Sequence, residues 1–83
     1  MYPGDVERVL MDHPDVREAG VDAGTAFVAL RTGATAEPDT LLSFCRTRLA
    51  PAEVPTEVVL VDDLPRSSVG KLLRQELRSV PRP

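Results

Sequence analysis

Cysteine, histidine and aromatic residues are scarce in this chain of 83 residues. The one cysteine, Cys45, excludes a disulfide within the chain, and one cysteine with one histidine cannot form the usual four-ligand zinc site. The aromatic residues are Tyr2, Phe27 and Phe44. We therefore expect no metal site, and a core built mainly from valine, leucine and alanine.

The chain also lacks an excess of positive charge and any long apolar segment. Its formal net charge of −3 at pH 7 argues against nucleic-acid binding by neutralisation of phosphates. The longest apolar runs are too short to cross a membrane, and the N-terminus lacks the charged and apolar regions of a signal peptide. We expect a cytoplasmic protein that binds neither nucleic acid nor membrane.

The length suits one small domain, expected to span residues 1–83 with a core at 1–78 and a tail at 79–83. A domain of this size buries only about 60% of the surface of its unfolded chain, so a deep enclosed active site is hard to build. Such a chain is more naturally part of a site than a whole one.

Hydrophobic periodicity and turn residues predict three helices and three strands. The residues Asp22-Ala23-Gly24 predict a three-residue hairpin turn with glycine in the left-handed region. The continuous apolar run from Val58 to Val61 is typical of a strand buried on both faces. The order α-β-β-α-β-α predicts an α+β domain in which about three helices cover a three-stranded sheet. The expected elements are the helix Pro3–Asp12, the strands Val16–Val21 and Thr25–Arg31, the helix Pro38–Leu49, the strand Val58–Val61 and the helix Gly70–Arg78.

Lys71 directly follows a glycine, in a loop of small residues at the expected start of the last helix. Gly70 lets the backbone approach a ligand closely, and the N–H groups of a helix N-terminus favour anions. Because lysine is positively charged at neutral pH, the segment suits a phosphate or a carboxylate. The alternative is a solvated charge, because Lys71, Arg74 and Arg78 have a spacing typical of the exposed face of a helix.

Three longer segments carry a family resemblance. They are YPGDVERVLMDHPDV, AFVALRTGA and LLSFCRTRLAPAEVPTEVVLVDDLPRSSVGKLLRQEL, and they cover nearly the whole chain. The pattern Leu-Pro-Arg…Gly-Lys-(apolar)₂-Arg at the end is the most specific part. In these segments the chain resembles the small C-terminal domain of the adenylate-forming enzymes, which include acyl-CoA synthetases, adenylation domains of nonribosomal peptide synthetases, and luciferases.

The resemblance implies that the chain is the lid of a larger N-terminal domain that binds ATP, with Mg, and a carboxylic acid. In this family the lid supplies a lysine that contacts the carboxylate and the α-phosphate during adenylation. The lid then rotates so that a thiol can attack the acyl-adenylate. Lys71 matches that lysine, and Arg66, Ser67, Ser68 and Gly70 match the loop that faces substrate and nucleotide.

The resemblance also implies partners. An N-terminal adenylation domain would act in the same chain or as a separate one. The thiol acceptor would be CoA, or phosphopantetheine on a carrier protein. Alone, the chain is expected to bind no cofactor and to catalyse no adenylation.

Three features depart from the family's pattern. The large domain is not among these residues. The longer loop that the family carries between its first two strands, with a Pro-Asp…Gly-Glu pattern, is reduced to residues 22–24. Ala52-Glu53 stands where the family often has Tyr-Lys. The shortened loop leaves a second function open: a non-catalytic remnant, or a protein-interaction module, that keeps the lid fold.

Other polar residues have both a chemical and a structural interpretation. His13 could be a general base, but it lies before a proline and is expected at a helix end. Cys45 could be a nucleophile, but it lies on the apolar face of a predicted helix, where a buried thiol is expected. Asp62 and Asp63 could bind a metal, but adjacent carboxylates on an extended segment point in opposite directions, so a turn is expected. Arg66 could contact a phosphate or the partner domain, or remain on the surface.

Overall fold

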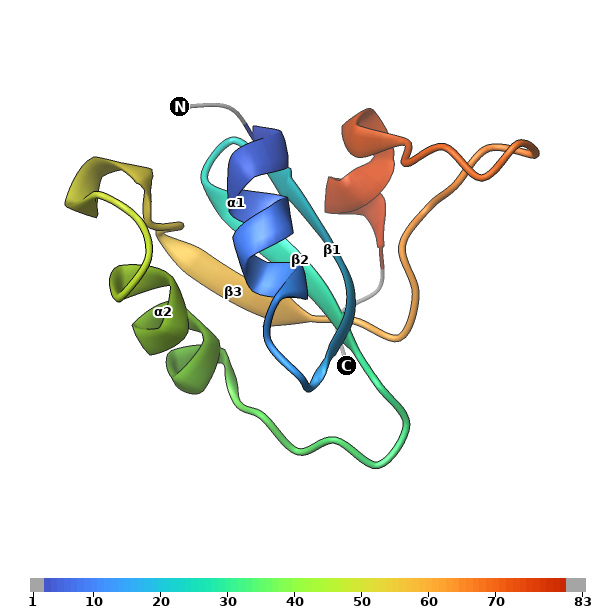
Figure 1. Ribbon diagram of the computed structural model, residues 1–83. Helices are drawn as coiled ribbons and strands as arrows, with labels where there is room; N and C mark the ends of the chain where they lie inside the picture. Colours follow the sequence, from blue (N-terminus) through green and yellow to red (C-terminus); the bar gives the residue numbers. More distant parts are fainter. Residues whose placement is uncertain (1–2, 81–83) are drawn as a thin grey trace.

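The computed structural model describes residues 3–80, which form a three-stranded sheet with helical segments on both faces (Figure 1). The elements are α1 (Pro3–Met11), β1 (Val16–Asp22), β2 (Thr25–Leu30), α2 (Pro38–Arg46), β3 (Glu57–Leu60) and two 3₁₀ segments, η1 (Pro51–Glu53) and η2 (Arg74–Ser79). The central strand β2 is antiparallel to β1 and parallel to β3. The predicted α+β class, with helices covering a three-stranded sheet, is confirmed.

Each face of the sheet carries its own apolar cluster. The helix-covered face joins the sheet to α1 and α2, and its buried members are Val6, Leu10, Val16, Ala19, Val21, Ala26, Val28, Leu41, Cys45 and Val58. The opposite face, here called the η2 face, has the buried members Phe27, Val59, Val61, Leu64 and Leu77. Because Val58 and Val59 belong to different clusters, β3 is covered on both faces, as predicted.

The hairpin between β1 and β2 is tighter than expected. Asp22 pairs with Thr25, so the loop has the two residues Ala23 and Gly24 rather than three. Both have positive φ, 49° and 86°, as in the two-residue turns that match the right-handed twist of the strands. The prediction of a left-handed glycine is confirmed, and the predicted loop length is wrong by one residue.

Helix α2 ends at Arg46, three residues before the predicted end at Leu49. The hydroxyl of Thr47 donates a hydrogen bond to the carbonyl of Phe44 at 2.7 Å, and the Thr47 N–H donates to the same oxygen at 3.3 Å. A threonine that bonds locally in this way competes with the helical pattern. The apolar face of the helix is nevertheless as predicted, because Leu41 and Cys45 are both fully buried.

Gly20 lies in β1 where the η2 face comes closest to the sheet. A side-chain Cβ at this position would lie 3.2 Å from methyl carbons of Leu72 and Leu77. The absence of a side chain at Gly20 therefore lets η2 pack directly on β1.

The last predicted helix differs most from the structure. Helical geometry begins at Arg74 rather than Gly70, and it is a 3₁₀ segment rather than an α-helix. Residues 65–73 instead form an irregular hairpin that projects from the body (Figure 1). Two leucines of this segment turn inward: Leu77 is buried, and Leu72 packs against the cluster of the η2 face.

Two further observations concern membrane-spanning helices and the C-terminal tail. In the described part of the chain, no helix is long and apolar enough to span a bilayer. Of the expected tail, Val80 packs against the η2 face, and residues 81–83 lie outside the described residues, as does Tyr2.

Candidate functional site

The candidate site is the Lys71 hairpin, defined here as residues 65–73. A bridge between Arg66 and Leu72 closes it. Inside the bridge, the Ser67 N–H donates to the Lys71 carbonyl at 2.8 Å and the Gly70 N–H donates to the Ser67 carbonyl at 2.9 Å. Gly70, the last residue of the turn at 67–70, has φ 83° and so lies in the left-handed region. This is the three-residue hairpin loop in which the left-handed position favours glycine.

This geometry corrects the predicted setting of the lysine. Lys71 is not at the N-terminus of a helix, because η2 begins three residues later. The free N–H groups of a helix end therefore do not lie beside its ammonium group. Gly70 has a conformational role instead, because its positive φ reverses the chain immediately before Lys71.

The Lys71 side chain is presented to solvent. Residues 68–71 are all exposed, and Val69 at the tip is 86% exposed. Among residues 3–80, no ion pair and no hydrogen bond engages the Lys71 ammonium. Lys71 is also the only lysine in the sequence. The hairpin thus carries one exposed cation that has no ion-pair partner among the described residues.

The other predicted loop residues stabilise the hairpin and add no unpaired charge to it. The Ser67 hydroxyl accepts a hydrogen bond from the Lys71 N–H at 3.2 Å. Ser68 is exposed in the turn. The Arg66 guanidinium donates from Nε and Nη2 to Glu18 Oε1, at 2.9 and 2.7 Å, and from Nη1 to the Gly70 carbonyl at 3.0 Å. The structure therefore brings all five predicted residues together in one hairpin.

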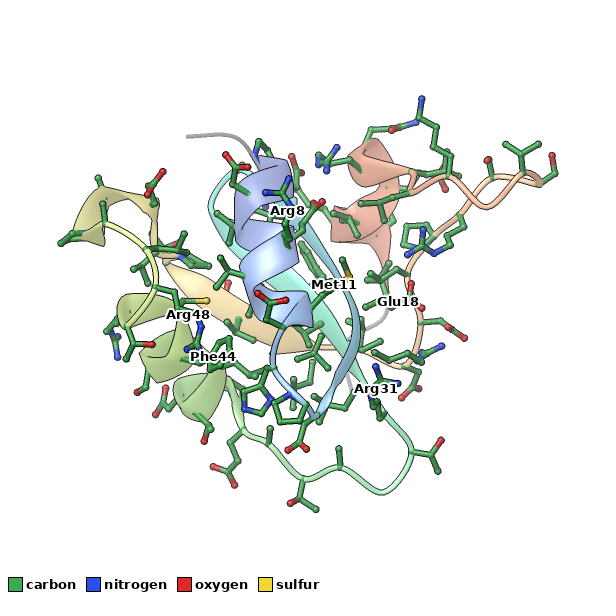
Figure 2. The ribbon with its side chains drawn as sticks, viewed as in Figure 1. Arg8, Met11, Glu18, Arg31, Phe44 and Arg48 are labelled. Carbon is green, nitrogen blue, oxygen red and sulfur yellow. The ribbon has the colours of Figure 1, made fainter. Side chains whose placement is uncertain are left out.

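Glu18 is a residue of this region that the sequence analysis missed. It lies in β1, 48 residues from Arg66 in the chain, and its side chain is only 14% exposed. Its second oxygen, Oε2, lies 3.3 Å from Arg17 Nη1. Figure 2 labels Glu18 on the side of β1 that faces the segment leading to the hairpin. No local pattern marks such a contact, because its two partners meet only in the folded chain.

The side chains of Arg74 and Arg78 remain 40% and 56% exposed, but both form ion pairs that tie η2 to the body of the domain. Arg74 donates to Glu7 Oε2 at 2.7 Å and to the Val21 carbonyl at 2.9 Å. Arg78 pairs with Asp22 at 3.1 Å. Of the three cations in this spacing, only Lys71 remains without an ion pair among the described residues. The terminal arginine of the sequence motif, Arg74, thus ties η2 to α1 and β1.

The remaining candidates have structural settings. His13 accepts the Asp15 N–H at its Nδ1, at 3.0 Å, and its ring meets Phe44 edge-on at 4.9 Å, as expected of a helix-end residue. Figure 2 shows Phe44 beside Arg48, whose guanidinium carbon lies 3.8 Å from the ring centre. Cys45 is buried in the core as predicted, and desolvation raises the pKa of its thiol.

Asp62 and Asp63 lie in the segment that leads from β3 to the Lys71 hairpin. Arg17 donates to the Asp62 carbonyl at 2.8 Å and to the Asp63 carboxylate at 3.2 Å. Within residues 3–80, no group of three His, Cys, Asp or Glu side chains is placed to hold a metal ion. A large surface hollow of about 560 Å³ lies elsewhere, beside α2 and η1, with Leu49, Val54 and Pro55 among its walls. The Lys71 hairpin is a projection and not a pocket.

Comparison with known proteins identifies the family. The model of the AMP-binding enzyme C-terminal domain matches residues 5–71. The chain belongs to this family. The match ends at Lys71, so it includes the candidate lysine and all four loop residues. The resemblance to the adenylate-forming enzymes is confirmed.

The relatives are CoA ligases of much greater length. The chain is 46% identical to 2-succinylbenzoate–CoA ligase of Geobacillus kaustophilus, over 94% of this chain and 18% of the relative. It is 40% identical to long-chain-fatty-acid–CoA ligase of Escherichia coli O157:H7, over 94% of this chain and 15% of the relative. The chain therefore spans less than a fifth of the length of either relative. The alignment with the first relative runs over 87 positions, more than the chain has residues, so that relative carries residues that this chain lacks.

Solved structures agree with the sequence comparison. Unliganded O-succinylbenzoate CoA synthetase from Bacillus subtilis matches with a TM-score of 0.86 and 36% identity, over 99% of this chain and 18% of the other. ATP-bound MatB from Rhodopseudomonas palustris matches with a TM-score of 0.86 and 32% identity, over 95% of this chain and 18% of the other. The fold of this chain is the fold of one small part of each of these larger proteins.

Proposed function

We propose that this chain is the lid of an ATP-dependent acid–thiol ligase and that Lys71 is its catalytic residue. Carboxylate attack on the α-phosphate of ATP gathers negative charge, and a positioned ammonium group stabilises that charge by electrostatic attraction. One observation carries the proposal. Lys71 is exposed near the tip of a projecting hairpin, and no acidic side chain among the described residues neutralises it.

Most of the active site would belong to an N-terminal adenylation domain, linked to this chain or separate from it. The hairpin supplies one cation and one shaped loop, with Arg66, Ser67, Ser68 and Gly70 presenting Lys71 to substrate and nucleotide. In this proposal ATP, Mg²⁺ and the carboxylic acid bind to the larger domain, as the family resemblance implies. ATP with its Mg²⁺ would supply the electrophilic α-phosphate.

The thiol acceptor in this proposal is CoA, because the relatives described above are named as CoA ligases. Phosphopantetheine on a carrier protein is the other thiol that the family uses. A cytoplasmic location and a domain spanning residues 1–83 remain predictions.

A non-catalytic role is the second candidate, and the β1–β2 hairpin favours it. The two-residue loop Ala23-Gly24 leaves no projecting segment at that end of the sheet. A lid that has lost this segment could keep the fold as an interaction module while no longer serving thiol transfer.

A chimera separates the two candidates. Residues 1–83 would replace the lid of the Geobacillus kaustophilus 2-succinylbenzoate–CoA ligase, and ligation of 2-succinylbenzoate to CoA would be compared with that of the ligase body alone. The catalytic proposal expects the chimera to regain activity and Lys71→Ala to lower its turnover by about 10²- to 10³-fold. Arg8→Ala, which removes another exposed cation, is the matched control and should leave turnover unchanged. A folded chimera no more active than the body alone would contradict the catalytic proposal and favour the interaction module.

A further inference from the structure

The Lys71 hairpin has few attachments to the body of the domain. Its backbone hydrogen bonds at 66–71 are internal, and Leu73 N–H also bonds within the hairpin, to the Pro65 carbonyl at 2.9 Å. Leu72 packs on the η2 face. Within residues 3–80, the polar side-chain contact from this hairpin to the rest of the protein is the one between Arg66 and Glu18. The direction in which the hairpin projects therefore depends strongly on this contact.

The Arg66 guanidinium joins two parts of the structure at once. On one edge of the group, Nε and Nη2 both donate hydrogen bonds to the Glu18 carboxylate on β1. The remaining terminal nitrogen, Nη1, holds the carbonyl of Gly70, which belongs to the peptide unit that continues into Lys71. Arginine can do this because its donors are fixed in one plane, whereas a lysine presents a single ammonium at the end of a flexible stem.

Glu18 is itself held in place. The pairing of β1 with β2 shifts between Val16 and Glu18, which is a β-bulge at Arg17. Neighbouring residues of a regular strand point to opposite faces, but a bulge re-aims them. Here Arg17 and Glu18 both reach the segment 62–66, and they also pair with each other at 3.3 Å. A chain of contacts thus runs from Asp63 through Arg17, Glu18 and Arg66 to Gly70.

An isolated surface ion pair would contribute little to stability, but this arrangement is a network anchored on a mostly buried carboxylate. We infer that Glu18 and Arg66 are positioning residues that hold the Lys71 hairpin in one orientation, so that the ammonium reaches the reacting carboxylate and α-phosphate at the right place. The catalytic half of this inference rests on the proposed function of Lys71. It gives Arg66 a role different from direct contact with a phosphate.

The first test uses the full 83-residue chain and needs no partner. In Arg66→Ala and Glu18→Gln chains, ¹⁵N relaxation and amide exchange of residues 69–71 should show greater mobility, whereas the amides of β2 stay protected. Arg66→Lys, which keeps the charge but loses the planar fork, should resemble Arg66→Ala. Arg78→Ala breaks an exposed ion pair elsewhere and is the matched control. Unchanged mobility of residues 69–71 in folded Arg66→Ala and Glu18→Gln chains would overturn the inference.

The second test uses the chimera with the ligase body. Misplacing a catalytic group by about 1 Å can cost up to about 10²-fold in rate, so Arg66→Ala should lower kcat roughly 10-fold while the KM for ATP changes less than about twofold. Arg66→Lys should not restore kcat. If Lys71→Ala abolishes turnover but Arg66→Ala and Glu18→Gln leave kcat unchanged, the positioning role is wrong and the proposed function stands. If Lys71→Ala has no effect, the proposed function fails, and the relaxation measurement alone decides whether the pair holds the hairpin.

Discussion

The two faces of the sheet are built in different ways. On the helix-covered face, α1 and α2 pack on the sheet through the larger of the two apolar clusters. On the η2 face, a smaller cluster is supplemented by arginines that bond to β1 and α1. The first face can supply most of the stability, and the second can hold a projecting hairpin at a defined angle. The contrast suggests that folding and the proposed chemistry depend on opposite sides of one small sheet.

The largest expected effect on stability is on the helix-covered face. Leu10 is fully buried between α1 and the sheet, and its replacement by alanine leaves a cavity. Leu10→Ala should lower the free energy of unfolding by about 2–5 kcal/mol, a large part of the ~4–12 kcal/mol expected for this length. Met11→Ala is the matched control, because Met11 is 46% exposed and should change stability little. Urea denaturation followed by circular dichroism measures both, and equal losses would contradict the assignment of Leu10 to the core.

A smaller loss is expected where η2 meets the sheet. Gly20→Ala places a methyl group 3.2 Å from carbons of Leu72 and Leu77, and overpacking of this kind costs about 1–3 kcal/mol. The same exchange at Gly4, which has open space around it in α1, should be neutral or stabilising by up to about 1 kcal/mol. Thermal unfolding of the two variants should therefore shift in different directions. An unchanged melting temperature for Gly20→Ala would mean that η2 is free to move away from β1.

The smallest expected effect is a pH dependence within the helix-covered face. Burial raises the pKa of the Cys45 thiol above its value in the unfolded chain, so the folded state favours the neutral thiol. This contribution to stability is complete below the unfolded pKa and is lost as pH rises through the folded pKa. Stability should therefore fall more steeply above about pH 8.5 in the native chain than in Cys45→Ala. Parallel slopes for the two chains, measured by urea denaturation from pH 7.5 to 10.5, would show that the thiol is not desolvated.

Local sequence patterns predicted most of the fold. The Asp22-Ala23-Gly24 turn, predicted one residue too long, and the run Val58–Val61 each describe their own element, because periodicity and turn chemistry act over a few residues. The Lys71 hairpin was misjudged for the same reason. The sequence predicted a helix over Gly70–Arg78, whereas the actual geometry depends on contacts with residues far away in the chain.

The sequence selected the candidate site residues but not their arrangement in space. The resemblance selected Lys71 and its loop because these residues form a compact sequence motif. It could not reveal that Arg66 bonds to Glu18, or that Arg74 bonds to Glu7, which lies 67 residues away. Such pairs depend on how η2 and the hairpin pack on β1, and this packing depends in turn on Gly20 and on the bulge at Arg17.

The most direct test of the central claim is to measure the two half-reactions of the chimera separately in single-turnover experiments with and without Lys71. The account predicts that Lys71→Ala slows formation of the acyl-adenylate by about 10²- to 10³-fold. Thioester formation from supplied acyl-adenylate and CoA should stay within about twofold of the unmodified chimera, because the proposed rotation of the lid carries Lys71 away from the α-phosphate before the thiol attacks. An undiminished rate of adenylate formation, or an equal loss in both half-reactions, would contradict the account.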